Sequence, residues 1–364
     1  MRGAVTFRTK TTGFRFLHIG QMRGFQDFAD AGNHRFITDL CRSTASQSLS
    51  MPGETTMKTL FTLTTLVAII CPFAYGAIGN DKAYQNAGDS FAPFYELGNK
   101  NPYLCVGSLK NGGSAVWIGG KWALTVAHAV NTKRGEDINN VMTITTRDET
   151  IDIPVTAAFT PDHLLEKDTG GPDIALIKLA FVPRVRNLTP ATLSSKEDLI
   201  GLEAVYSGYG TLGLGSTGPD GNHFKRPHPG LRFGFQNKFE NYTNNGFVVR
   251  SIFDEKGLPL EGCGSGGDSG SGAFVNLDGK WQLVAINAHS DVGPNGRFYQ
   301  KAPVYGSSTG SIRVALFYPE IQKALKENDT SAFVSLTWEE LQNRVKRTQQ
   351  KETLRSKTSG LLPH

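Results

Sequence analysis

The sequence predicts an all-β protein, and three observations lead to that class. Short apolar or alternating runs, divided by Gly, Asn and Asp, recur from residue 102 onward and are typical of strands, as at 115–118, 122–126 and 151–155. The chain contains 41 glycines and 10% aromatic residues, which suits a loop-rich β protein better than a helical bundle. Helical periodicity occurs only near the C-terminus. The close spacing of the runs indicates a sandwich or a barrel.

Two segments near the C-terminus predict helices. Residues 318–325 begin with Tyr-Pro and continue with apolar side chains at helical spacing. Thr337 and Glu340 form a capping box, which predicts a basic helix from there to about Arg355. The basic tail 338–357 is interpreted either as a solvated helix or as a site for an anionic partner.

Residues 1–56 show no sustained periodicity, and we interpret them as an upstream extension of a protein that starts at Met57. The alternative is a cytoplasmic or targeting segment that precedes a signal anchor.

Residues 57–76 predict a secretory signal peptide, which places the protein outside the cell or in the periplasm. A lysine is followed by an apolar run over 60–70 and by the small residues Ala74 and Gly76, so cleavage is expected after Gly76. The run is short and rich in threonine, which argues against a stable membrane span.

The formal net charge of +5 is unevenly distributed. Lys and Arg concentrate in residues 1–76 and 344–357, and the central body has a small net negative charge. We therefore expect no nucleic-acid surface on the body.

A glycine-rich stretch at 264–272 reads GSGGDSGSG and places Ser269 directly after Asp268. A helix is unfavourable here because glycine is costly to order. Such a run lets the backbone turn sharply and bring N–H groups beside one hydroxyl, as a nucleophile with an oxyanion pocket requires. By itself, the stretch also fits a flexible Gly/Ser loop.

Two upstream segments favour the nucleophile. Residues 125–129 read TVAHA, and residues 173–179 read DIALIKL. With the glycine-rich stretch, they resemble the trypsin/chymotrypsin-like serine peptidase family, whose His, Asp and Ser occur in this chain order. Residues 205–212, VYSGYGTL, are similar to the family's Ser-Gly-Trp-Gly-Thr turn, with Tyr209 replacing tryptophan.

The resemblance covers residues 102–326 and implies two antiparallel six-stranded β-barrels with a C-terminal helix. The barrels are expected over about 102–190 and 195–310, with the active site between them. Residues 77–101 are then a lead-in or a propeptide, and residues 327–364 are a basic helical tail.

The resemblance also implies roles for individual residues. His128 would be the general base, Asp173 would orient its imidazole, and Ser269 would attack the substrate. The N–H groups of Gly267 and Ser269 would bind the oxyanion. We therefore expect a serine endopeptidase that acts on proteins or peptides through an acyl-enzyme, with no cofactor and no metal.

Other interpretations remain open. Taken singly, His128 fits a buried histidine, Asp173 a loop cap and Ser269 a turn residue. The chain as a whole also fits a non-catalytic homologue that binds a partner, or an esterase-like acyl hydrolase.

One departure from the family concerns activation. In members activated by cleavage, a new N-terminal amine pairs with the aspartate before the serine, and Asp268 has no such obvious partner. A buried carboxylate without a partner is costly, so we expect another partner for Asp268 or a constitutively formed site. Residues 77–100 remain a candidate propeptide. Cys105 and Cys263 either form one disulfide or remain two free thiols.

The substrate pocket is less well defined. By position, Cys263 lies where the family sets the pocket floor, so an aspartate that selects Arg or Lys is absent. Glu261 would substitute if the loop slides. Asn287 and His289 match the strand that lines the pocket, and His289 would favour an acidic substrate residue unless it is a polar rim residue.

A metal site is a weak alternative elsewhere. Asp220, His223 and His228 share a Gly/Pro-rich loop, but their spacing fits no established pattern, and a solvated loop explains them better.

Overall fold

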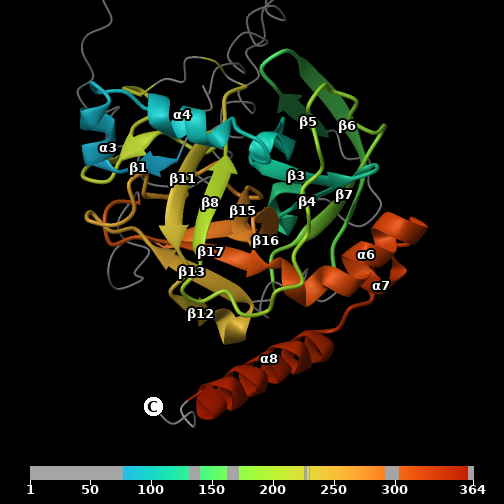
Figure 1. Cartoon of the computed structure of the whole chain (residues 1–364). Coiled ribbons are helices and arrows are strands. Elements are labelled where there is room, and N and C mark those ends of the chain that lie inside the picture. Colours follow the sequence, from blue (N-terminus) through green and yellow to red (C-terminus); the bar gives the residue numbers. More distant parts are fainter. Residues whose placement is uncertain are drawn as a thin grey trace, which may run out of the picture. The chain divides into compact units, whose positions relative to one another are not determined.

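Strands dominate the fold, which confirms the predicted class (Figure 1). The computed structural model describes residues 77–130, 140–161, 172–224, 228, 230–291 and 303–359, with side chains through 348 and at 350. All of them belong to the second of the chain's two units, Cys71–His364. The predicted extension 1–56 and signal peptide 57–76 lie outside the described residues.

The first half of this unit forms a closed antiparallel barrel of six strands, in the order β2-β3-β4-β7-β6-β5. Its strands are β2 (Val106–Leu109), β3 (Ser114–Gly119), β4 (Trp122–Thr125), β5 (Asn140–Thr145), β6 (Thr150–Phe159) and β7 (Ala175–Leu179). A 3₁₀ turn, η2 (Tyr103–Cys105), leads into it. The predicted first barrel is therefore confirmed.

The second half contains a seven-stranded antiparallel sheet in the order β11-β8-β15-β16-β17-β13-β12. Its strands are β8 (Glu203–Gly208), β11 (Phe233–Lys238), β12 (Asn241–Thr243), β13 (Val248–Ile252), β15 (Gly272–Leu277), β16 (Lys280–Asp291) and β17 (Ser308–Arg313). A turn, η4 (Asn244–Gly246), joins β12 to β13.

The strand pairings of the described residues do not show a second closed ring, so the expected second six-stranded barrel stays a prediction. The sheet nevertheless curls. The Tyr206 hydroxyl on β8 lies 3.1 Å from the Ser251 hydroxyl on β13, although three strands separate β8 from β13.

The segment after Ala77 is built into the second half. Strand β1 (Ile78–Gly79) lies between β9 (Gly213–Leu214) and β14 (Gly262–Cys263), in a small sheet that β10 (Gly218–Pro219) completes. The helices α3 (Asp81–Asn86) and α4 (Ala92–Gly98) follow, and the Asn80 side chain caps α3. Gly98 approaches β11 so closely that an added Cβ would lie 2.6 Å from the Gly234 nitrogen. The predicted lead-in is thus part of this half's core.

A buried arginine on the approach to β11 joins this segment to the barrel. The guanidinium of Arg232 is fully buried and donates to the carbonyl oxygens of Gly98 (3.2 Å), Val106 (3.1 Å) and Thr145 (2.6 Å). It also donates to the Tyr209 hydroxyl at 3.1 Å. An indole has no oxygen to accept this bond, which gives a physical reason for a tyrosine and not a tryptophan at position 209.

Replacing Phe94 by alanine is expected to lower the free energy of unfolding by about 3–5 kcal/mol, as for other buried phenylalanines. Phe94 is fully buried, and its ring stacks on that of Phe233 with centroids 4.7 Å apart. Urea unfolding of the chain that begins at Ala77 measures the change. The exposed Phe181→Ala is the control, and equal effects of the two substitutions would contradict the placement of α4 in the core.

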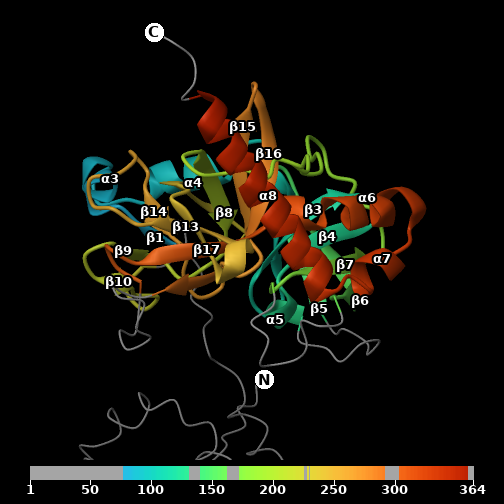
Figure 2. The same cartoon turned by 90° about the horizontal axis from the view of Figure 1, so that it is seen from below.

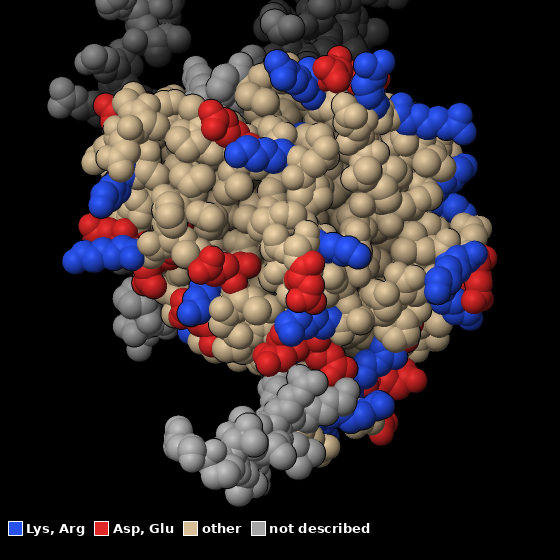
Figure 3. Space-filling model, in the orientation of Figure 1, with Lys and Arg blue, Asp and Glu red and all other residues tan. Residues whose placement is uncertain are grey.

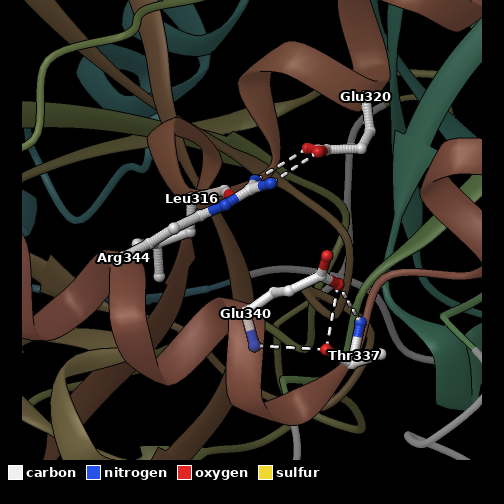
Figure 4. A network of polar contacts seen from close by, with 5 residues as sticks. All are labelled: Leu316, Glu320, Thr337, Glu340 and Arg344. Carbon is white, nitrogen blue, oxygen red and sulfur yellow. Dashed lines mark hydrogen bonds and ion pairs between the residues drawn. The ribbon is translucent and has the colours of Figure 1, made fainter.

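Both predicted C-terminal helices are confirmed. Strand β17 leads through η5 (Val314–Phe317) into α6 (Tyr318–Glu327) and α7 (Ser331–Val334), and α8 (Trp338–Ser359) ends the described chain (Figure 2). The capping box forms, since Thr337 Oγ1 accepts from the Glu340 amide at 3.2 Å (Figure 4). Arg344 binds both carboxylate oxygens of Glu320 and so joins α8 to α6.

The first half of α8 packs against the body, where Trp338 stacks on Phe247. A partner for the basic tail 338–357 stays a prediction. On the face shown in Figure 3, coloured acidic and basic side chains are interspersed, mostly around the rim. Among the described helices, none combines the length and apolar character needed to cross a membrane.

Candidate active site

His128 and Asp173 meet because β4 and β7 are antiparallel neighbours. Thr125 at the end of β4 pairs with Ala175 at the start of β7. The residues that follow Thr125 and those that precede Ala175 therefore share one end of the barrel. The short helix α5 (Ala127–Val130) carries His128 there, and Asp173 lies two residues before β7.

The carboxylate of Asp173 holds His128 through two contacts. Its Oδ2 binds the ring nitrogen Nδ1, and its Oδ1 accepts from the His128 backbone amide at 2.9 Å. When Nδ1 carries the proton, Nε2 is left as an acceptor. The hydrogen bond to Asp173 raises the pKa of His128 above its usual value, against partial desolvation and with help from the Asp173 charge. This pair can accept a proton from a neighbouring hydroxyl.

The loop between β14 and β15 that carries Ser269 is bound to the barrel. The Ser114 amide, at the start of β3, donates to the Ser269 carbonyl at 2.7 Å, and the Ser114 hydroxyl donates to the Gly267 carbonyl at 3.3 Å. Thr125 donates through Oγ1 to the Ser114 carbonyl at 2.7 Å. Gly270 has φ +86°, and an added Cβ would lie 2.0 Å from the Ser114 oxygen, so only glycine fits there.

Ser269 lies near the helix that carries His128. An added Cβ on Gly113 would lie 2.9 Å from the Ser269 carbonyl oxygen and 3.4 Å from the Ala129 Cβ. The Ser269 backbone and Ala129, the residue after His128, thus lie on either side of Gly113. No hydrogen bond joins the Ser269 hydroxyl to His128 in the described part of the chain. The structure joins His128 to Asp173 directly and places Ser269 on an adjacent loop.

Asp268 is buried, and its partners are not an N-terminal amine. This agrees with the expectation that its carboxylate binds another group. Its Oδ1 accepts from the Gly210 amide at 2.7 Å, and its Oδ2 accepts from the Ser265 amide at 2.9 Å. These bonds tie the loop to the turn after β8. The amides of Gly267 and Ser269 have no acceptor among the described residues. Free amides beside a serine are what an oxyanion pocket requires.

The predicted pocket residues lie on two strands next to this loop. Cys263 is fully buried, and its Sγ lies 3.3 Å from Thr309 Oγ1. Asn287 is joined through its backbone to the residues that follow Ser269, and the partly exposed His289 lies 3.9 Å from a carboxylate oxygen of Asp291.

Glu261 does not substitute at the pocket floor. Its buried carboxylate accepts from the Asp254 amide at 2.8 Å and from the Leu258 amide, so it closes the loop before β14. Burial raises the pKa of this carboxyl group, against the opposing effect of these two bonds.

The two candidate disulfide partners are both free thiols. Cys105 and Cys263 are fully buried, and burial raises the pKa of each to about 12. Both are therefore poor nucleophiles at neutral pH.

The candidate metal residues have other roles in the structure. Asp220 Oδ1 accepts from the amides of Asn222 (3.1 Å) and His223 (2.9 Å), and His228 Nδ1 accepts from the Gly230 amide at 3.1 Å. Across the described ranges, no group of three or more His, Cys, Asp or Glu residues is placed to hold a metal.

Sequence reasoning missed three residues here: Ser114 binds the Ser269 loop to the barrel, Thr125 donates to Ser114, and Gly113 leaves room for the Ser269 carbonyl. The signal for Thr125 was present, because it begins the TVAHA motif. The Gly-Gly-Ser run at 112–114 reads as an ordinary hairpin turn, and only the tertiary contact with Ser269 shows its role.

No family model matches the chain, and no curated protein matches it. Among solved structures, one match is neuropsin, a serine protease expressed in the limbic system of mouse brain. The two chains are 16% identical with a TM-score of 0.47, and the match covers 64% of this chain and 96% of the other. A likeness of this size does not by itself establish an activity.

Proposed function

We propose that the protein is a secreted or periplasmic serine endopeptidase that uses His128, Asp173 and Ser269. The observation that carries this proposal is the twofold contact between Asp173 and His128, beside the loop that holds Ser269. A histidine fixed in one tautomer by a carboxylate, next to a serine with free neighbouring amides, suits acyl transfer. The curled seven-stranded sheet would take the place of the family's second barrel.

The reaction would proceed in two halves. The Ser269 hydroxyl attacks the peptide carbonyl carbon while His128 Nε2 takes its proton. The amides of Gly267 and Ser269 stabilise the resulting oxyanion. His128 then gives the proton to the leaving amine, and an acyl-enzyme remains. Water, activated by the same imidazole, releases the acid product.

Fluorophosphonate labelling of the chain that begins at Ala77 tests the proposal. We expect one covalent adduct, located on Ser269 by peptide mapping and absent from Ser269→Ala. A folded sample that takes up no label would contradict the proposal and favour a binding homologue. Labelling together with hydrolysis of esters but not of peptides would favour the esterase alternative.

A further inference from the structure

Strand β16, which runs beside the Ser269 loop, contains a bulge at the substrate pocket. Asn287 pairs with Ser311 of β17, but His289 pairs with the adjacent residue, Gly310. Ala288 is therefore an extra residue without a partner. Side chains alternate between the faces of a regular strand, and an extra residue changes that alternation.

The contacts show which side chains share a face. Ser290 donates through Oγ to the Gly264 carbonyl at 2.6 Å, and a Cβ added to Gly264 would lie 2.5 Å from Asn287 Nδ2. Asn287 and Ser290 thus both face Gly264, the residue directly after β14. His289 covers Gly310, where an added Cβ would lie 2.3 Å from its Nε2. The bulge turns His289 away from the wall formed by Asn287.

Asn287 is held beside the nucleophile, but its amide is unused. Its carbonyl accepts from the Gly270 amide, and its own amide N–H donates to the Ser271 carbonyl, both at 2.8 Å. The residue is only 2% exposed. Its side-chain amide makes no hydrogen bond within the described part of the chain. The amide atoms are nevertheless not completely closed off from solvent. Water can bind an amide that solvent still reaches, so a guest that displaces this water must supply the hydrogen bonds in its place.

The wall around Asn287 carries hydroxyl and thiol groups and no charge. The Gly264 amide donates to Thr309 Oγ1 at 2.9 Å, next to the Cys263 thiol. Burial is the main cause that raises the pKa of Cys263 to about 12; hydrogen bonds with Thr309 and Ser290 oppose the rise, and the carboxylates of Asp268 and Asp291 add a smaller contribution to it. These carboxylates disfavour an anionic guest, and amides already bind Asp268. Among the described residues, a cationic guest would find both carboxylates engaged, because amides bind Asp268 and Asp291 lies 3.9 Å from His289 Nε2.

We propose that Asn287 selects the substrate side chain on the acyl side of the cleaved bond, and that this side chain is a carboxamide, glutamine or asparagine. An amide both donates and accepts, so it matches the Asn287 amide group for group. A site that hydrogen-bonds a substrate group discriminates strongly against analogues that lack it. This assignment rests on the proposed peptidase function and names the substrate class of the same site.

Peptides that differ only at this position test the assignment, with Gln compared with Glu, Lys and Met. We expect kcat/KM for Gln to exceed each of the others by about 10-fold or more. In Asn287→Leu, the Gln-to-Met ratio of kcat/KM is expected to fall to near unity. Asn287→Asp keeps the shape, and it is expected to raise the Lys-to-Gln ratio about 10-fold or more.

Asn276→Leu is the matched control, because this asparagine is exposed on β15, and it should leave all ratios unchanged. His289→Ala tests the competing assignment. A preference for Glu that His289→Ala removes would overturn the proposal, and so would a Gln preference that survives Asn287→Leu. Absence of fluorophosphonate labelling at Ser269 would overturn the proposed function as well. Normal labelling with selectivity independent of Asn287 would overturn this inference alone.

Discussion

Replacing Asp173 by asparagine is expected to lower kcat for peptide hydrolysis by about 10⁴-fold. Asp173 binds His128 Nδ1 with one oxygen and the His128 amide with the other. An asparagine NH₂ facing Nδ1 would force the ring to accept there, which leaves the proton on Nε2. The imidazole then cannot take the Ser269 proton. Steady-state kinetics on one peptide substrate measures the loss.

Asp148→Asn provides the control, because Asp148 lies exposed in the turn between β5 and β6. It should retain full activity. A loss in Asp173→Asn of less than about 10-fold, with the fold intact by circular dichroism, would show that the pair does not act in catalysis.

The pH profile gives a second measure of the same pair. Below the pKa of His128 the ring is protonated and cannot act as a base, so kcat/KM rises as pH increases through that pKa. The hydrogen bond to Asp173 raises this pKa, which places the acidic limb above the ordinary histidine value. The residual activity of Asp173→Asn should show the limb at lower pH, because the raising interaction is gone. If the acidic limb of the pH profile stayed at the same pH in Asp173→Asn, the titrating group would be one other than His128.

Replacing Asp268 by asparagine is expected to slow fluorophosphonate labelling of Ser269 by about 100-fold, comparable to the loss of an oxyanion donor. Each carboxylate oxygen accepts from one backbone amide, those of Gly210 and Ser265. An asparagine retains only one acceptor, so its NH₂ would oppose one of these amides. The loop would shift, and with it the amides of Gly267 and Ser269.

The same substitution should lower the free energy of unfolding by about 1–3 kcal/mol, because it leaves a buried N–H without an acceptor. Labelling rates and urea unfolding are measured on the same preparations, again beside Asp148→Asn. Labelling at the unsubstituted rate, together with the expected loss of stability, would show that the Asp268 contacts serve folding and not the site.

The strands were accessible from the sequence because local patterns encode them, whereas the closed barrel and the His128–Asp173 pair were implied by the family resemblance that the motifs carry. Alternating runs mark the strands, and the motifs around His128 and Asp173 sit at the ends of strands that pair. The capping box of Thr337 and Glu340 is likewise a local signal, and the helix begins where it predicts. Such features depend on neighbours within a few residues, so they survive without knowledge of the fold.

Other features depend on contacts between residues far apart in the chain. The lead-in after Ala77 reads as polar with scattered aromatic residues, but its Phe94 stacks on Phe233 in the core. The partners of Asp268 come partly from Gly210, 58 residues away. Glu261 was a candidate for the pocket until its hydrogen bonds placed it in the preceding loop.

The sequence alone determined the β class, the C-terminal helices and which residue types are available for acyl transfer. Only the tertiary structure decided that the second sheet has seven strands, that Ser114 holds the Ser269 loop, and that Asn287 and not His289 faces Gly264. For the orientation of Asn287 and His289, the physical reason is the extra residue at Ala288. A single unpaired position reverses the side-chain alternation of β16, and pairing with β17 reveals that position, which the one-dimensional pattern does not.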